Sequence, residues 1–168
     1  YKTQQLVRQI LTTLYTDKPD GICGNDDVGQ MSAWYVMSAM GFYPVCPVDN
    51  QYVVASPLFE KISINLENGK KFVIEAPNAE KTPYVKAIKL NNKQYDKAFI
   101  NYEDIKDGGI MQFTMSSEPV KDFATAKEDR PYSKIESEDF CVTPFVSYQG
   151  TGTFTKNIEV YFKAFNPQ

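Results

Sequence analysis

The sequence contains no histidine, and this absence excludes several kinds of catalytic site. Ser-His-Asp and Cys-His systems need an imidazole as their base, and histidine-ligated zinc sites need imidazole as a ligand. Any chemistry performed by these residues must therefore use carboxylates, tyrosine, lysine or cysteine.

Cysteine is scarce, with Cys23, Cys46 and Cys141 as the three examples. Their spacing matches no metal-ligand pattern, and the odd number at low density argues against a disulfide framework. Free cysteines usually behave as small apolar residues in protein interiors, so we expect these side chains to be buried.

Excess basic charge and long apolar runs are also missing. The chain has 18 Lys and Arg against 21 Asp and Glu, a net charge of −3. Without a basic patch, nucleic acid is not expected as a partner. Because no apolar run approaches the roughly 18 residues that a bilayer requires, no membrane span is expected.

The residues that are present suit a globular protein. The 168 residues are 42% apolar and 14% aromatic, with 11 Tyr and 11 Phe. This composition allows a buried core and fits either packed sheets or a sugar-facing surface. The sequence starts at Tyr1 inside a helical pattern, without an initiator methionine or signal peptide, so we expect a segment of a longer protein.

Two helices are predicted near the start of the chain. In the first, the apolar residues recur on one face: Leu6, Val7, Ile10, Leu11 and Leu14. A turn at residues 18–21 should end it. The second helix should run from about Asp26 to Met40, with Asn25 or Asp26 as N-cap and Gly41 just after its end.

After residue 46 the pattern changes to short strands with period-two alternation. We expect strands at 61–66, 71–76, 85–90, 93–95, 97–102 and 110–115, with turns at Asn68-Gly69, Asn91-Asn92 and Asp107–Gly109. The predicted fold is therefore α+β, with a helical pair at 1–45 and an antiparallel sheet or sandwich at 46–120. Residues 121–168 should form a charged linker, then further strands or the start of an appended β module, with a turn at Gly150 and Gly152.

Asp26 and Asp27 stand side by side at the start of the second predicted helix. They could be plain helix caps, because aspartate is a preferred N-cap. One could instead remain ionised as a general base, since the helix dipole favours an anion there. An autonomous calcium loop is not expected, because the alternating acids and glutamate at position 12 of an EF-hand are missing.

Three stretches resemble one enzyme family: KTQQLVRQIL, GICGNDDVGQMSAWYVMSAMGFYPVCP and YVVASPLFEKI. They look like the C-terminal part of glycoside hydrolase family 92, whose members are calcium-dependent, inverting exo-α-mannosidases. The resemblance covers most of residues 1–116. It implies an N-terminal β-sandwich packed on an (α/α)6 barrel, of which this chain would hold the last helical hairpin and a final β region.

The resemblance also implies roles for individual residues. The family's catalytic base falls on Asp27, with Asp26 as the adjacent supporting acid. Asn25 stands where some members have a further aspartate, Gly24 would keep the backbone close to the sugar, and Gln30 would orient Asp27 or the water. The general acid, a glutamate, and most calcium ligands would lie upstream, so no metal ligand is assigned here.

The function implied is removal of terminal mannose from glycans such as N-glycans, with an α-1,2 linkage expected. The implied partners are a mannose-containing glycan and the missing sandwich and barrel of the same polypeptide. We expect the isolated chain to be inactive and to self-associate through exposed helices. A secreted, periplasmic or cell-surface location would follow. The alternative is a non-catalytic β module that binds carbohydrate or docks to another domain.

Overall fold

A computed structural model of the chain describes residues 1–46, 48–132, 145–147 and 161–163. The chain divides into two compact units, residues 1–131 and residues 132–168, and each is described by itself. The first unit is a mixed α+β structure with few helices and two sheets, which confirms the predicted fold class at this level.

Two helices come first, as predicted. Helix α1 spans Lys2–Thr13 and helix α2 spans Gln30–Met40. The predicted start of α2 at Asp26 is wrong, because Asp27, Val28 and Gly29 all have positive φ and cannot continue a right-handed helix. Two short helical segments follow later, α3 at Tyr102–Ile105 and the 3-10 turn η1 at Lys127–Asp129.

The smaller sheet carries the chain away from α2. It has the order β1-β2-β7, with β1 at Phe42–Tyr43, β2 at Gln51–Val54 and β7 at Phe99–Asn101. Strand β2 was not predicted, because its sequence QYVV lacks a period-two alternation. Gly41 has φ +97° and lies between α2 and β1, which confirms the predicted helix end.

The larger sheet has five strands in the order β3-β4-β8-β5-β6. Their bounds agree closely with the prediction: β3 Lys61–Asn65, β4 Lys71–Glu75, β5 Tyr84–Leu90, β6 Lys93–Tyr95 and β8 Gly109–Ser116. A purely antiparallel sheet is wrong, because β4 pairs with β8 in parallel. Alternation along a strand determines which face is buried but not which strand becomes its neighbour.

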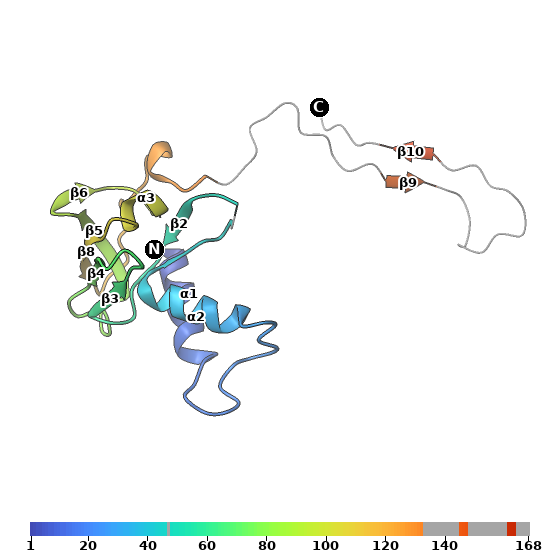
Figure 1. The fold of residues 1–168 in the computed structure, drawn as a ribbon, viewed down its shortest axis with the longest axis horizontal. Coiled ribbons are helices and arrows are strands. Elements are labelled where there is room, and N and C mark those ends of the chain that lie inside the picture. Colours follow the sequence, from blue (N-terminus) through green and yellow to red (C-terminus); the bar gives the residue numbers. More distant parts are fainter. Residues whose placement is uncertain (47, 133–144, 148–160, 164–168) are drawn as a thin grey trace, which may run out of the picture. The chain divides into compact units, whose positions relative to one another are not determined.

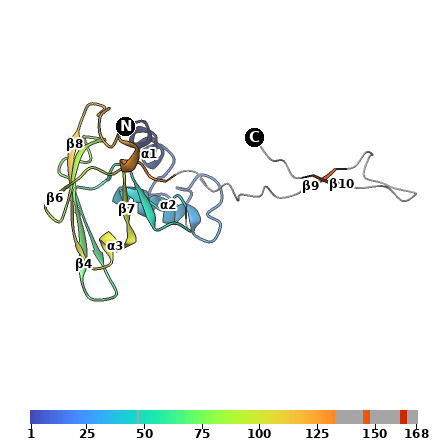
Figure 2. The same ribbon diagram turned by 90° about the horizontal axis from the view of Figure 1, so that it is seen from above.

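Both sheets contribute to one hydrophobic core, as in a sandwich (Figures 1 and 2). Its fully buried members come from both: Phe42, Val54 and Ile100 from the smaller sheet, and Phe72, Ile74, Val85, Ile88, Met111 and Phe113 from the larger one. The core therefore lies in the β region, and the two helices stand beside it.

Helix α1 packs through a different face from the one its apolar pattern suggests. Leu11 is buried, but Leu6 is 59% and Leu14 46% exposed. The buried Gln4 accepts a hydrogen bond from the Val85 N–H at 3.1 Å. The Arg8 guanidinium donates to the Ser56 hydroxyl at 2.9 Å and to the Pro57 carbonyl at 2.6 Å. Polar side chains thus attach α1 to β5 and to the segment between β2 and β3, while Leu6 and Leu14 are left uncovered.

In the second unit the described residues form one antiparallel pair, β9 at Phe145–Ser147 with β10 at Tyr161–Lys163. These strands lie within the stretch predicted to return to strand pattern. The predicted turn at Gly150 and Gly152, and Cys141, lie outside the described residues.

Candidate functional site

The predicted site lies at the end of the connection between α1 and α2, residues 14–29. In Figures 1 and 2 this connection extends on the side of the helices remote from the five-stranded sheet. Its first part is a small hairpin in which Tyr15 pairs with Ile22 and the Thr16 N–H donates to the Gly21 carbonyl at 2.9 Å. The predicted turn at residues 18–21 is therefore present, and the chain is returned to the start of α2.

Asp26 is partly buried and is attached to the first turn of α2. The backbone N–H of Ser32 donates to Oδ1 of Asp26 at 2.8 Å, and the Ser32 hydroxyl donates to Oδ2 at 2.8 Å. Ser32 is the third residue of α2, so its N–H is one of the donors that lack a partner within the helix. The Asp26 side chain therefore caps the first turn of α2, although the N-cap position itself is occupied by Gly29.

The backbone between Asp26 and α2 is unusual. Asp27 has φ 34°, Val28 φ 63° and Gly29 φ 84°, so three successive residues lie in the left-handed region. Glycine accepts this conformation readily, but a β-branched residue such as Val28 does so rarely and at a cost. The turn is closed by the Gln30 N–H, which donates to the Asp26 carbonyl at 2.7 Å.

Asp27 has a different environment from its neighbour. Its side chain is exposed, and within the described part of the chain no hydrogen bond or ion pair reaches its carboxylate. The next residue, Val28, is also fully exposed. Of the two adjacent acids, the Asp26 side chain is hydrogen-bonded to helix α2, whereas the Asp27 carboxylate is exposed to solvent.

The contacts of Asp26 change its acidity. Hydrogen bonds from the backbone N–H of Ser32 and then from its hydroxyl lower the pKa of the Asp26 carboxyl, because they stabilise the ionised form. Asp26 therefore stays charged through the neutral and mildly acidic range.

This shift predicts how the stability of the chain depends on pH. A carboxyl with a lowered pKa in the folded state stabilises the fold above its unfolded pKa of about 3.9, and loses that contribution as the pH falls further. We expect Asp26→Asn to be less stable than wild type at neutral pH, with a gap that narrows below about pH 4. Urea unfolding of both proteins from neutral pH to about pH 3 measures the gap, and a gap independent of pH would contradict the assignment.

The other predicted site residues surround the turn, and within the described chain none of their side chains is hydrogen-bonded to the Asp27 carboxylate. Gly24 has φ +81° with open space around it, and Asn25 and Gln30 are exposed. Within the described residues no hydrogen bond joins the Gln30 side chain to Asp27. The structure therefore places these residues on one exposed stretch that ends at Gln30, the first residue of α2, and it attaches the Asp26 side chain to that helix through Ser32.

Aromatic side chains pack behind the turn. Tyr15 stacks on Trp34 with ring centroids 5.8 Å apart and lies 4.9 Å from Tyr35, and Trp34 also meets Tyr43 at 6.4 Å. The Tyr15 hydroxyl donates to the Met31 carbonyl at 3.2 Å, and burial is the main cause that raises its pKa. Sequence reasoning missed Tyr15, because a residue of a connecting loop gives no periodic signal.

No metal centre is formed by the described residues alone. They contain no group of three or more His, Cys, Asp or Glu side chains placed to hold an ion. Both oxygens of Asp26 are engaged by Ser32. Cys23 and Cys46 are exposed rather than buried as predicted, because both lie in loops that flank α2 and not in the core.

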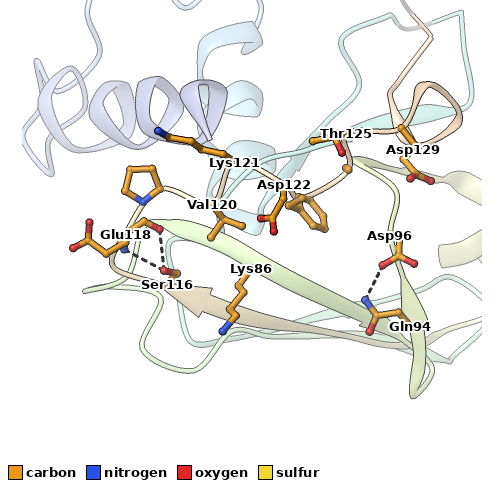
Figure 3. Close-up of a pocket in the computed structure, with 14 residues that line it drawn as sticks. Lys86, Gln94, Asp96, Ser116, Glu118, Val120, Lys121, Asp122, Thr125 and Asp129 are labelled. Atoms are coloured by element: carbon orange, nitrogen blue, oxygen red, sulfur yellow. Dashed lines mark hydrogen bonds between the residues drawn. The ribbon is translucent and has the colours of Figure 1, made fainter.

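The β region has a separate hollow, of about 910 Å³, between strands β5 and β6 and the segment that follows β8 (Figure 3). Lysines, carboxylates and amides line it, including Lys86, Asp96 and Asp122, and Gln94 donates to Asp96 at 2.8 Å. Phe123 is the aromatic residue among those that line it. Apolar side chains such as Val120 and Phe123 share the lining with these polar groups, so the hollow is of mixed polarity.

Comparison with protein families gives one result for this chain. The model of the glycosyl hydrolase family 92 catalytic domain matches residues 1–117. This range contains α1, the Asp26–Asp27 turn, α2 and both sheets of the first unit.

Solved structures and a curated relative agree with that match. A family 92 inverting mannosidase from Bacteroides thetaiotaomicron is 42% identical, with a TM-score of 0.74, over 79% of this chain. A family 92 alpha-mannosidase from the same bacterium is 43% identical, with a TM-score of 0.74, over 77% of this chain. An uncharacterized secreted glycosidase from Arthroderma benhamiae is 31% identical over 71% of this chain.

The chain spans only a small part of these relatives, 18% of each of the two bacterial proteins and 16% of the fungal one. None of the helices described for this chain is long and apolar enough to cross a membrane.

Proposed function

The chain belongs to glycosyl hydrolase family 92, and from this membership we propose that it is the C-terminal part of a longer exo-α-mannosidase. Its helices would be the last hairpin of an (α/α)6 barrel. The observation that supports this most directly is the contrast between the two acids: Asp26 is held by Ser32, while the adjacent Asp27 carboxylate is exposed and unpaired in the described part of the chain.

In the proposed reaction Asp27 is the general base. Its carboxylate takes a proton from a water molecule as the water oxygen attacks the anomeric carbon of a terminal α-mannoside. The bond to the leaving oxygen breaks, and a general acid outside this chain gives that oxygen a proton. Direct attack by water inverts the anomeric centre, and such enzymes hold the two carboxyl groups roughly 6.5–9.5 Å apart.

The sugar side of the site would include Gly24, Asn25 and Gln30. All three lie on the same exposed stretch as Asp27. An α-1,2-linked glycan is the proposed substrate. Calcium is proposed as a cofactor of the longer protein. Most of its ligands are proposed to lie in the rest of the polypeptide, because the described residues form no such site by themselves. The proton transfer assigned to Asp27 does not involve the ion.

The uncovered apolar face of α1 supports the same proposal. Leu6 and Leu14 are exposed, and so is Val36 of α2. Apolar patches of this kind mark surfaces that another part of a protein covers. We propose that the upstream barrel covers them in the longer protein and that the isolated chain self-associates through them. Export from the cytoplasm is proposed from the fungal relative, which is described as secreted.

The alternative function is a non-catalytic module that binds glycans. The hollow of mixed polarity shown in Figure 3 is the observation that favours it, since sugars are bound by carboxylate and amide side chains such as those of Asp96 and Gln94. This hollow contains neither Asp26 nor Asp27.

Hydrolysis of an aryl α-mannoside tests the proposal. We expect the longer polypeptide to release the aryl group, with β-mannose as the first product seen by NMR. We expect the isolated chain of 168 residues to be inactive, because the general acid is proposed to lie outside it. Turnover by the isolated chain, or retention of the α configuration, would contradict the proposal. Binding of mannosides without turnover by either protein would favour the alternative.

A further inference from the structure

The turn that carries Asp27 is held in a conformation that its own residues do not favour. Asp27 and Val28 lie in the left-handed region at φ 34° and 63°. Val28 is 110% exposed, so packing within the described chain does not compensate for its backbone conformation. Non-glycine residues held in this region persist only where the surrounding structure fixes them, and they are concentrated at functional sites.

The contacts that fix the turn come from the residues on its two sides. On one side is the Asp26 carboxylate, and on the other is the first turn of α2, where Ser32 donates to both carboxylate oxygens at 2.8 Å. The Gln30 N–H donates to the Asp26 carbonyl oxygen at 2.7 Å and so joins the same two sides of the turn. Three hydrogen bonds therefore close a loop around residues 27–29.

We propose that Asp26 and Ser32 are positioning residues for Asp27: their two-point contact holds residues 27–29 in the left-handed turn that presents the Asp27 carboxylate. This inference rests on the proposed function, in which Asp27 is the base. A base acts efficiently only within hydrogen-bond reach of the proton that it removes, so the direction of its carboxylate has to be held.

The Ser32 hydroxyl is the part of this contact that can be removed most cleanly. In Ser32→Ala the backbone N–H still donates to Oδ1 of Asp26, but Oδ2 loses its donor. The carboxylate is then held by one hydrogen bond and is free to rotate about it. Ser32→Thr keeps a hydroxyl at the same position. The sequence gives little sign of this role, because the Asp26 to Ser32 spacing is longer than that of an ordinary capping box.

The test measures aryl α-mannoside hydrolysis by the longer polypeptide. A misplacement of about 1 Å can reduce a rate by roughly a hundredfold, so we expect Ser32→Ala to lower kcat by about tenfold to a hundredfold. KM should stay within about twofold, since the Ser32 hydroxyl is engaged by Asp26 and is given no role in substrate binding. Ser32→Thr should recover most of the lost kcat. Ser63→Ala, at an exposed serine of β3, is the matched control and should equal wild type.

A second variant separates positioning from stability. Val28→Gly removes the steric reason that makes the left-handed turn costly, but it also widens the backbone conformations open to residue 28 and so loosens the hold on the neighbouring Asp27. We expect its kcat to fall while the thermal unfolding midpoint of the isolated chain stays at or above the wild-type value. Loss of activity through unfolding would instead lower both together.

Asp27→Asn is assayed in parallel, so that failure of the positioning role can be told apart from failure of the base assignment. If Asp27→Asn is inactive while Ser32→Ala or Val28→Gly keeps the wild-type kcat, the positioning role is wrong and the base assignment stands. The same holds if Ser32→Thr fails to recover activity. If Asp27→Asn remains fully active, both proposals are wrong, because there is then no base to position.

Discussion

Replacing Asp27 with asparagine in the longer polypeptide is expected to lower kcat for an aryl α-mannoside by roughly 10²–10⁴-fold, the usual contribution of a general base. The amide has nearly the shape of the carboxylate but cannot accept the proton of the attacking water. Because the Asp27 side chain is exposed and its carboxylate makes no hydrogen bond within the described residues, the substitution should leave the fold intact. Steady-state rates and far-UV circular dichroism of both proteins check the two parts of this expectation.

Two controls make the result specific. Asp20→Asn changes another exposed aspartate of the same connection and should keep the wild-type rate. Azide needs no deprotonation, so it should restore turnover to Asp27→Ala and give a β-mannosyl azide. A rate for Asp27→Asn within about threefold of wild type, far above the usual loss for a missing base, would rule out the base assignment.

The second large effect is expected from Phe72→Ala in the core of the β region. Phe72 is 0% exposed and lies on β4, the strand that joins the antiparallel and parallel parts of the five-stranded sheet. Removing a fully buried phenylalanine side chain typically costs about 3–5 kcal/mol, through lost burial and the cavity left behind. The midpoint of urea unfolding of the isolated chain should fall accordingly, without a change in slope.

Phe59→Ala is the matched control, because Phe59 loses the same side chain but is 48% exposed. Its effect should be well below that of Phe72→Ala. Equal losses for the two variants would mean that the chain does not rely on this core for its stability. They would also suggest that Phe59 is covered in solution by another copy of the chain.

The strands of the β region were predictable because their signals are local. Period-two alternation and Asn-Gly or Asn-Asn turns placed β3, β4, β5, β6 and β8 within one or two residues. Their order in the sheet was not predictable, because β8 inserts between β4 and β5 and makes a parallel pair. Strand neighbours depend on contacts between residues far apart in the sequence, which alternation does not encode.

For the helices, too, the local features were predictable and the long-range contacts were not. Their existence followed from periodicity and from Gly41, but the face by which α1 packs did not. Leu11 is buried but Leu6 is largely exposed, while the polar Gln4 and Arg8 make hydrogen bonds to the β region. An apolar stripe identifies a surface that needs to be covered, and it does not say by which part of the molecule.

The sequence by itself determined the α+β class, the positions of the turns and the pair of acids before α2. Each of these depends on residue type and short-range spacing. Only the tertiary structure showed that the two acids have different surroundings, because this difference depends on backbone dihedrals and on Ser32. Asp26 accepts two hydrogen bonds from the first turn of α2, and the left-handed turn leaves Asp27 exposed. Two identical neighbouring side chains therefore have different hydrogen-bonding environments, since the fold supplies donors to the Asp26 carboxylate and leaves the Asp27 carboxylate exposed.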